Sequence, residues 1–427
     1  MPNTIKAEMW DRMQFLFRNY YDRMVHAKLV YTGDIDLPAL KNALLFMLEK
    51  APVLHSSFVT TVVEPYWKEE QYTIDDVLSL FEVDNADKDA DEWLVGVIPY
   101  TSNVQMKIAL FKDACHTVFC LRVNHMCMDG GDLKYFLATL VENYGYLKNG
   151  EYGKLHIKSG SRSYDQVYST FEGDDLKHAR GLYKNIAKAT EKVYFPWSEP
   201  AAEDKNTIVR RTIGEQDFAT MRQVSKKLGI TVNDALMAAT FRALYEMCGL
   251  KDDDPLTVSC AIDLRKHIKQ GGLLGGMTNH TAWMAVRTLQ KGDDIRDTVV
   301  NVIRSTKGFK RDKFMGLYSL PLLKLAYTIF PHDLAEFAIK AGYDNPLIAV
   351  SNMGLLDDAK LTFDGLTLTD GFISGAVKYK PFFLMSVTTL LGKLSLSTAI
   401  CGNAQDVEIA NRFFDGVERE IKEFELI

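Results

Sequence analysis

Apolar residues in the N-terminal part of the chain recur with helical spacing in some segments and form continuous runs in others. Residues 36–52 show helical periodicity and end at a proline, which cannot continue a helix. Residues 104–125 contain two apolar runs joined at Lys112 and Asp113, a pattern typical of two strands and a turn. Residues 131–147 then place their apolar side chains on one face, which predicts an amphipathic helix with one buried side.

The C-terminal part of the chain repeats this alternation after a polar, glycine- and proline-containing stretch at residues 151–204. Residues 217–249 predict two helices that separate at a glycine, and residues 381–400 predict a hairpin of two apolar strands. The whole pattern predicts an α/β fold in two halves of similar size, each built around a mixed sheet. We place these halves at residues 1–175 and 176–427.

The composition is that of a globular protein with more than one core. The chain has 427 residues, of which 47% are hydrophobic and 25% are charged. A chain of this length usually forms about two or three domains. The net charge of −6 argues against nucleic acid as a partner, because phosphate backbones bind to basic surfaces.

Several features of the sequence favour a cytoplasmic location. No apolar run reaches the roughly 18 residues that a membrane span requires, and the longest, residues 317–331, is interrupted by Pro321 and Lys324. The first residues lack the basic and apolar pattern of a signal peptide. The 6 cysteines form no CxxC pair, which favours free thiols in a reducing compartment. We therefore expect a cytoplasmic protein without a membrane span.

The segment VNHMCMDGGD, residues 123–132, places His125 four residues before Asp129. The preceding strand runs directly into the histidine and two glycines follow the aspartate, so the pair does not share a helix as metal ligands at this spacing do. No third ligand stands at an interpretable spacing, and we predict no metal site. A histidine at a strand end suits a general base. The alternative is a core or surface histidine with no chemical role.

The same segment resembles the HxxxDG motif of the coenzyme-A-dependent acyltransferase superfamily. Its members include chloramphenicol acetyltransferases, condensation domains of nonribosomal peptide synthetases and alcohol acetyltransferases. Further segments similar to motifs of this superfamily follow in the expected order, namely DRMQFLF at 11–17, KAPVLHSSF at 50–58, SYDQVY at 163–168, AIDLRKHI at 261–268, LGGMTNHTAW at 274–283 and AVSNMG at 349–354. The chain departs from condensation domains at Asn124, where these usually carry a first histidine, and it lacks the DFGWG motif of plant acyltransferases.

The resemblance implies a fold of two chloramphenicol-acetyltransferase-like subdomains with a tunnel between them. It implies that His125 takes the proton of the acceptor. It makes Asp129 a structural residue that pairs with Arg265 and holds the histidine loop in shape; a helix N-cap is the other reading of this aspartate, and the two are compatible. Gly130 and Gly131 would permit the turn there, because a side chain would collide with backbone or substrate.

Four further residues are candidates for the tunnel wall. Asn279 and Asn352 lie in segments similar to motifs of the family, although ordinary hydrogen bonding at strand ends would explain them equally well. Ser386 and Thr388, on a strand of the C-terminal hairpin, are candidate oxyanion donors. No permanently bound cofactor is implied, because coenzyme A or phosphopantetheine carries the acyl donor.

The resemblance thus implies an acyltransferase, with a place in secondary metabolism, that moves an acyl group from a thioester to a small alcohol or amine. An acyl carrier protein is a possible partner. Residues 304–313 form a dense basic run that would contact the donor phosphates, or would simply be an exposed face. Two alternatives are a catalytically silent condensation-like module that recruits a partner protein, and an unrelated α/β enzyme or ligand-binding protein. The second lacks any P-loop, GxGxxG or GxSxG signal.

Overall fold

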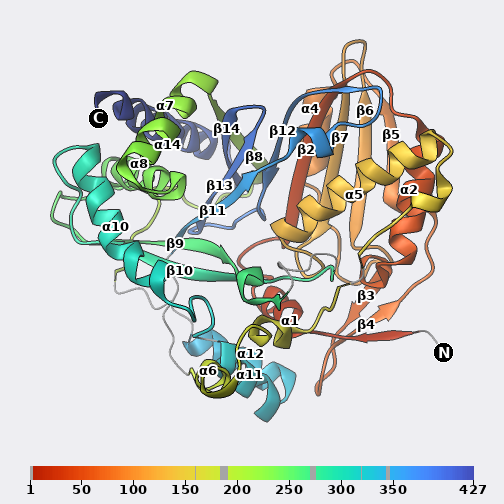
Figure 1. The fold of residues 1–427 in the computed structure, drawn as a ribbon, viewed down its shortest axis with the longest axis horizontal. Coiled ribbons are helices and arrows are strands. Elements are labelled where there is room, and N and C mark those ends of the chain that lie inside the picture. Colours follow the sequence, from red (N-terminus) through yellow and green to blue (C-terminus); the bar gives the residue numbers. More distant parts are fainter. Residues whose placement is uncertain (1–2, 159, 183–190, 270–275, 319, 343–346) are drawn as a thin grey trace.

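The computed structural model describes residues 3–158, 160–182, 191–269, 276–318, 320–342 and 347–427. Two helix-covered β-sheets lie side by side, and a small sheet with several short helices lies below the junction between them (Figure 1). This arrangement confirms the predicted α/β fold with two mixed sheets. The division of the chain at residue 175 stays a prediction.

The first sheet has five strands in the order β12-β2-β7-β6-β5. Their bounds are β2 (Met24–Thr32), β5 (Leu78–Glu82), β6 (Met106–Lys112), β7 (Thr117–Asn124) and β12 (Thr367–Ser374). Neighbouring strands are antiparallel except β5 and β6, which are parallel. The expected pair of strands within residues 104–125 is therefore present as β6 and β7.

Helices cover both faces of this sheet. One face packs on α2 (Leu37–Glu49) and α5 (Gly130–Lys148), and the other packs on α4 (Ala86–Leu94). Asp36 caps α2 by accepting a hydrogen bond from the Ala39 N–H. The apolar positions that predict the amphipathic helix are buried in α5, which confirms that helix. Two short helices, α3 (Ile74–Val77) and α13 (Asp358–Leu361), complete this half.

The second sheet has six strands in the order β10-β9-β11-β13-β14-β8. Their bounds are β8 (Lys205–Ile213), β9 (Leu256–Asp263), β10 (Thr281–Thr288), β11 (Ile348–Leu355), β13 (Phe383–Leu390) and β14 (Lys393–Gly402). One face is covered by α7 (Glu215–Leu228), α8 (Val232–Met247), α10 (Ile295–Arg311) and α14 (Ala404–Lys422). The predicted hairpin is confirmed as β13 and β14.

Two predicted breaks are explained by backbone conformation. Gly229 ends α7 with φ +65°, and Gly392 in the hairpin turn has φ +73°. Residues other than glycine rarely adopt this left-handed region without cost. The two helices and the two strands therefore separate where the sequence predicts.

The remaining elements lie below the two sheets. They comprise a small sheet of β1 (Thr4–Lys6), β3 (Ser56–Val59) and β4 (Tyr66–Glu69), the helices α1 (Met9–Leu16), α6 (Gly173–Arg180), α11 (Leu320–Ile329) and α12 (His332–Gly342), and short 3-10 turns. Asp11 on α1 is buried and accepts two hydrogen bonds from Arg162 at 2.7 Å. This pair fixes α1 to the segment that connects the two halves.

One strand crosses between the halves, which the sequence does not predict. β12 belongs to the C-terminal part of the chain but pairs with β2 at the edge of the first sheet. It then leads directly into β13 of the second sheet. Arg210 on β8 makes two hydrogen bonds to Asp370 on β12, at 2.6 and 2.7 Å. The two sheets are therefore connected by the crossing of β12 and by the hydrogen bonds between Arg210 and Asp370.

Candidate active site

His125 stands immediately after β7, as the sequence predicts. Its backbone N–H donates to the carbonyl of Arg23 at 2.7 Å, and Arg23 itself has φ +63°. The Asn124 side chain is buried, donates to Gln105 at 2.9 Å and accepts from the Met126 N–H at 3.1 Å. Asn124 therefore holds the turn, and the His125 ring points into the space between the halves.

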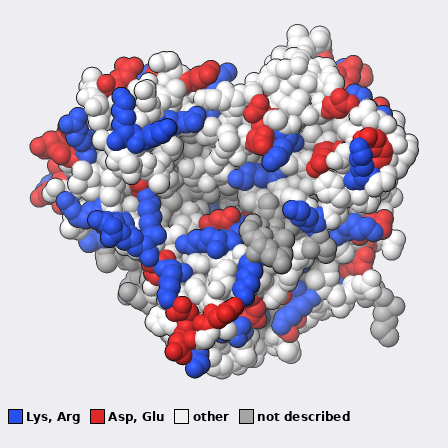
Figure 2. All heavy atoms as spheres, in the orientation of Figure 1, with Lys and Arg blue, Asp and Glu red and all other residues white. Residues whose placement is uncertain are grey.

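That space is a cavity of about 840 Å³ lined by residues of both halves. Figure 2 shows the molecule hollowed between its two sides. His125, Asn279 and Asn352 all line it, as do Asp129, Gly130 and Arg265. The histidine is thus brought together with the two predicted asparagines. Openings on two sides of a tunnel stay a prediction.

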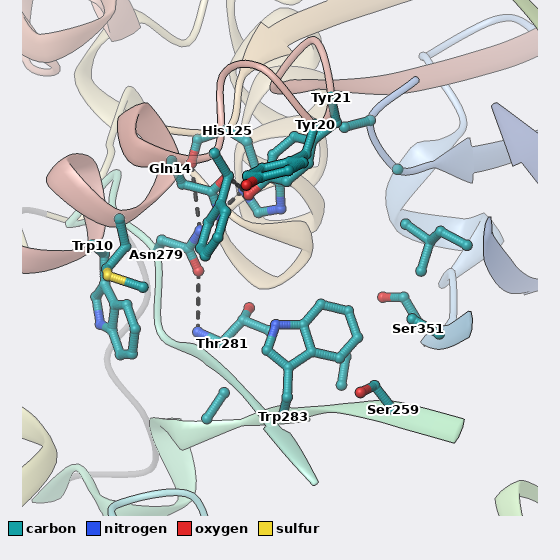
Figure 3. Close-up of a pocket in the computed structure, with 18 of the residues that line it drawn as sticks. Trp10, Gln14, Tyr20, Tyr21, His125, Ser259, Asn279, Thr281, Trp283 and Ser351 are labelled. Carbon is teal, nitrogen blue, oxygen red and sulfur yellow. Dashed lines mark hydrogen bonds between the residues drawn. The ribbon is translucent and has the colours of Figure 1, made fainter. Parts of the chain in front are cut away.

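The outer face of the second sheet supplies one wall. Residues at alternate positions of β9, β10 and β11 point away from the helical core and toward the cavity, among them Ser259, Thr281, Trp283 and Ser351 (Figure 3). The wall opposite comes from α1 and the turn after it, where Tyr20 and Tyr21 lie beside His125. A mostly apolar, aromatic cavity with a few polar groups is typical of a small-molecule site.

Asn279 orients the His125 ring. Its side-chain nitrogen lies 3.1 Å from Nδ1 of His125 and 3.5 Å from the His125 carbonyl oxygen. Its side-chain oxygen accepts from the Thr281 N–H at 3.1 Å, so the amide is held from both ends (Figure 3). These contacts restrict the orientation of the His125 ring.

The surroundings of His125 favour a neutral imidazole. Burial lowers the pKa of His125, and the positive charge of Lys378 acts in the same direction, whereas Asp129 opposes both. A neutral ring at neutral pH is the form that can accept a proton.

Asp129 binds the two halves together. Its oxygens accept hydrogen bonds from Arg265 at 2.8 and 2.9 Å and from the backbone N–H of His280 at 2.7 Å. It is also the N-cap of α5, since it accepts from the Gly131 and Asp132 N–H groups. The two readings of Asp129 are therefore both present in the structure. Burial opposes its ionisation, but Arg265 and the donated hydrogen bonds hold the pKa of Asp129 well below its usual value.

Arg265 contacts a second buried carboxylate that the sequence analysis misses. Its Nη2 lies 3.2 Å from Asp132, and Asp132 in turn accepts from the Thr278 N–H at 2.9 Å. Burial opposes the charge on Arg265, but Asp129 and Asp132 outweigh it and raise the pKa of Arg265. One guanidinium thus balances two carboxylates at the start of α5.

The role predicted for Gly130 needs a correction. Gly130 and Gly131 are the first residues of α5 rather than a turn before it, and neither has a positive φ. The predicted lack of room for a side chain is present, but the neighbours are side chains rather than backbone or substrate: a Cβ on Gly130 would lie 2.5 Å from Sδ of Met353, and one on Gly131 would lie 2.8 Å from Nη1 of Arg265.

Ser386 and Thr388 do not fit the predicted role of oxyanion donors. Neither is among the residues that line the cavity. Ser386 accepts from the Gly375 N–H at 3.0 Å, and Thr388 bonds to both backbone groups of Ile373 at 3.1 and 3.2 Å. These hydroxyls connect β13 to β12, and sequence alone could not show this because the strand crossing is unpredicted.

The basic run at residues 304–313 lies along α10 and the turn after it. None of its residues is among those lining the cavity, although Figure 2 shows Lys and Arg side chains gathered on the α10 side of the hollow. Lys310 is ion-paired with the buried Asp234, and Lys313 with Asp175. Lys307 and Arg311 are exposed.

Other site residues escape the sequence analysis. Tyr20, Tyr21, Trp283 and Lys378 line the cavity, and none has a spacing that marks it. The apolar segment after Pro321 also lines it, through α11, so it is not simply a core helix. Among the described residues, no three histidine, cysteine or acidic side chains are grouped so as to hold a metal. No helix in this part of the chain is long and apolar enough to cross a membrane.

The model of the condensation domain family matches residues 13–322, more than half of the sequence. The chain therefore belongs to the condensation domain family. It matches no curated protein sequence at a significant level.

Solved structures with the same fold include proteins with different activities. The first condensation domain of the CDA synthetase has a TM-score of 0.70 at 14% identity, covering 99% of this chain and 97% of that one. The trichothecene 15-O-acetyltransferase of Fusarium sporotrichioides has a TM-score of 0.68 at 12% identity, covering 98% and 94%. The epimerization domain of the third module of tyrocidine synthetase B has a TM-score of 0.69 at 13% identity, covering 100% and 98%. At these identities the likeness shows the fold alone.

The contacts of Asp129 predict a large effect on stability. Asp129→Ala should lower the free energy of unfolding by about 3–5 kcal/mol, because Arg265 loses the closer of its two buried carboxylates and the N–H groups of His280 and of the start of α5 lose their acceptor. Asp253→Ala is the matched control, since Asp253 is exposed and its side chain makes no hydrogen bond or ion pair with the described residues. Urea denaturation measures both. Equal losses in the two variants would contradict the proposed structural role.

Proposed function

We propose that this protein is an acyltransferase in which His125 acts as the general base. The observation that carries the proposal is the position of the His125 ring in a cavity shared by both halves, in a chain that belongs to the condensation domain family. The donor would be a thioester of coenzyme A or of a carrier protein, and the acceptor a small alcohol or amine.

The chemistry requires one ring nitrogen to be free. As the acceptor attacks the thioester carbonyl carbon, Nε2 of His125 takes the acceptor proton and a C–O or C–N bond forms. The C–S bond then breaks and the imidazolium returns the proton to the thiolate. Nε2 is free when Nδ1 carries the ring proton and donates it to the carbonyl of His125 or Met128, whose bonds raise the pKa of the ring. In this tautomer the side-chain nitrogen of Asn279, which is also a donor, makes no hydrogen bond to Nδ1 and donates to the His125 carbonyl at 3.5 Å instead.

Asp129, Arg265 and Asn279 would support this step without exchanging protons. The ion pair keeps the start of α5 in place, and the His125 turn precedes it by four residues. Asn279 contacts the ring directly. The apolar and aromatic wall of the cavity favours substrates with an apolar body and excludes water from the thioester.

The alternative of a silent recruiting module makes a different prediction for the cavity. Such a module would need neither a ring held by Asn279 nor a volume of about 840 Å³ beside it. Turnover measurements decide between the two. A parent protein that transfers no acyl group from any thioester in a broad panel would favour recruitment.

His125→Ala should lower turnover by about 10²–10⁴-fold, because a positioned base typically contributes this much. Release of free thiol from acyl-coenzyme A donors, with a panel of alcohols and amines, measures it. His156→Ala is the matched control, since His156 is an exposed histidine outside the cavity. The proposal is wrong if His125→Ala turns over a proven acceptor at the rate of the parent protein.

The pH dependence follows from the lowered pKa of His125. The acid limb of kcat/KM for the parent should lie below about 6.5, the usual histidine value, since the base stays neutral to lower pH. Asn279→Asp places a carboxylate beside Nδ1, which favours the imidazolium and should move this limb up by about 1 pH unit or more. Asn279→Ala adds no charge and should not move it upward. An unmoved limb in Asn279→Asp would rule out His125 as the titrating base.

A contribution of the basic run to donor binding is a separate proposal. Lys307 and Arg311 are exposed on α10, so reversing both to Glu should raise the KM for an acyl-coenzyme A donor at low salt, with the effect falling as salt screens the charges. Lys310 is left unchanged because it balances Asp234. Lys226→Glu with Lys227→Glu, on α7, makes the same charge change as a control. Equal KM values in both double variants would show that the run is only an exposed face.

A further inference from the structure

Lys378 brings an ammonium group to the cavity wall. It lies between β12 and β13, where its backbone bridges Tyr21 on one side and Ile400 on the other. Its N–H donates to the carbonyl of Ala399 at 2.8 Å, and its own carbonyl accepts from Cys401 at 3.0 Å. The backbone is thus held from both sides, and the side chain lines the same cavity as His125.

The ammonium lacks a contacting acceptor. Nζ lies 3.7 Å from the centroid of the Tyr21 ring. Among the described residues, no carboxylate oxygen lies within 4.0 Å of Nζ, and no oxygen accepts a hydrogen bond from it. Two other lysines differ in this respect: Lys380 contacts Asp406 at 2.7 Å, and Lys134, which also lines the cavity, donates to the Met353 carbonyl at 2.7 Å.

The nearest acidic group does not complete the site. Asp22 uses Oδ1 to accept from the N–H groups of Met24 and Val377, and its Oδ2 has no hydrogen-bond partner among the described residues. Burial raises the pKa of Asp22 to about 7 and lowers the pKa of Lys378 to about 8, and in each case the opposite charge only partly offsets it. An ammonium in an apolar cavity without a contacting anion is costly, and a bound anion would remove that cost.

We propose that Lys378 binds a carboxylate of the acceptor, so that the acceptor is an apolar or aromatic alcohol or amine that carries a carboxylate. This inference rests on the proposed acyl transfer. The wall beside Lys378 is aromatic, since the ring centroids of Tyr20 and Phe382 lie 5.2 Å apart there. Such a wall suits the apolar body of the acceptor.

The position of Lys378 indicates that the anion it would bind is not a phosphate of the acyl donor. Tyr21 forms a backbone β-bridge with Lys378. Two residues later, the carbonyl of Arg23 accepts a hydrogen bond from the backbone N–H of His125. Lys378 is therefore close to the reacting centre. In coenzyme A and in phosphopantetheine, the whole pantetheine arm separates the phosphates from the thioester. An anion beside Lys378 thus belongs to a group near the reacting atoms.

Calorimetric titration with two probes of equal size tests this, 4-phenylbutyrate and 4-phenylbutyramide, at pH 7. The parent should bind the carboxylate at least about tenfold more tightly than the amide, since a charge-assisted hydrogen bond is lost in the amide. Lys378→Met should remove the preference, and Lys378→Arg should retain most of it. Lys340→Met, which removes a lysine from another part of the cavity wall, should leave the preference unchanged.

Two results would overturn the proposal. One is a parent protein that does not prefer the carboxylate, whether both probes bind equally or neither binds. The other is a folded Lys378→Met that keeps the preference. If Lys378→Met does not fold, the proposal is still tested by the preference of the parent for the carboxylate over the amide and by its retention in Lys378→Arg. The same titration of His125→Ala separates this claim from the proposed function, because the preference should persist there whatever happens to turnover.

Discussion

The buried contact between Arg265 and two carboxylates, Asp129 and Asp132, is the interaction on which the arrangement of the site depends. All three side chains are almost fully buried, so each charge is tolerable only while its partners remain in place. The carboxylates belong to the start of α5 and the guanidinium to the C-terminal half. One electrostatic requirement therefore fixes the relative position of the two halves at the point where the His125 turn ends.

The cavity is a consequence of how the two sheets are joined. β12 leaves the C-terminal part of the chain to pair with β2, and the hydroxyls of Ser386 and Thr388 connect it back to β13. Between these connections the face of the second sheet that lies opposite α7, α8, α10 and α14 lines the cavity, and α1 and α11 pack against part of it. His125 follows the end of β7 and Lys378 follows the end of β12, and the side chains of both line the same cavity.

Local features of the sequence predict much of this structure. Apolar periodicity predicts α2, α5 and the hairpin of β13 and β14, and the resemblance at His125 and Arg265 predicts the ion pair. Periodicity could not predict the crossing of β12, because strand pairing between distant segments leaves no local signal. Periodicity also does not mark Lys378, Asp132, Tyr20 or Tyr21, because their positions depend on that crossing or on other tertiary contacts. The glycines show the same limit: the sequence predicts that a side chain at Gly130 or Gly131 would collide, but not that the neighbours are Met353 and Arg265, which are distant in sequence.

The most direct test of this account is a double-mutant cycle on Asp129 and Arg265, with the free energy of unfolding measured for Asp129→Asn, Arg265→Met and the double variant. If one buried charge network joins the halves, the double variant should be more stable than the sum of the single losses predicts, by about 1–3 kcal/mol. Single losses that add to within about 0.5 kcal/mol would contradict the account, because the two residues would then act independently.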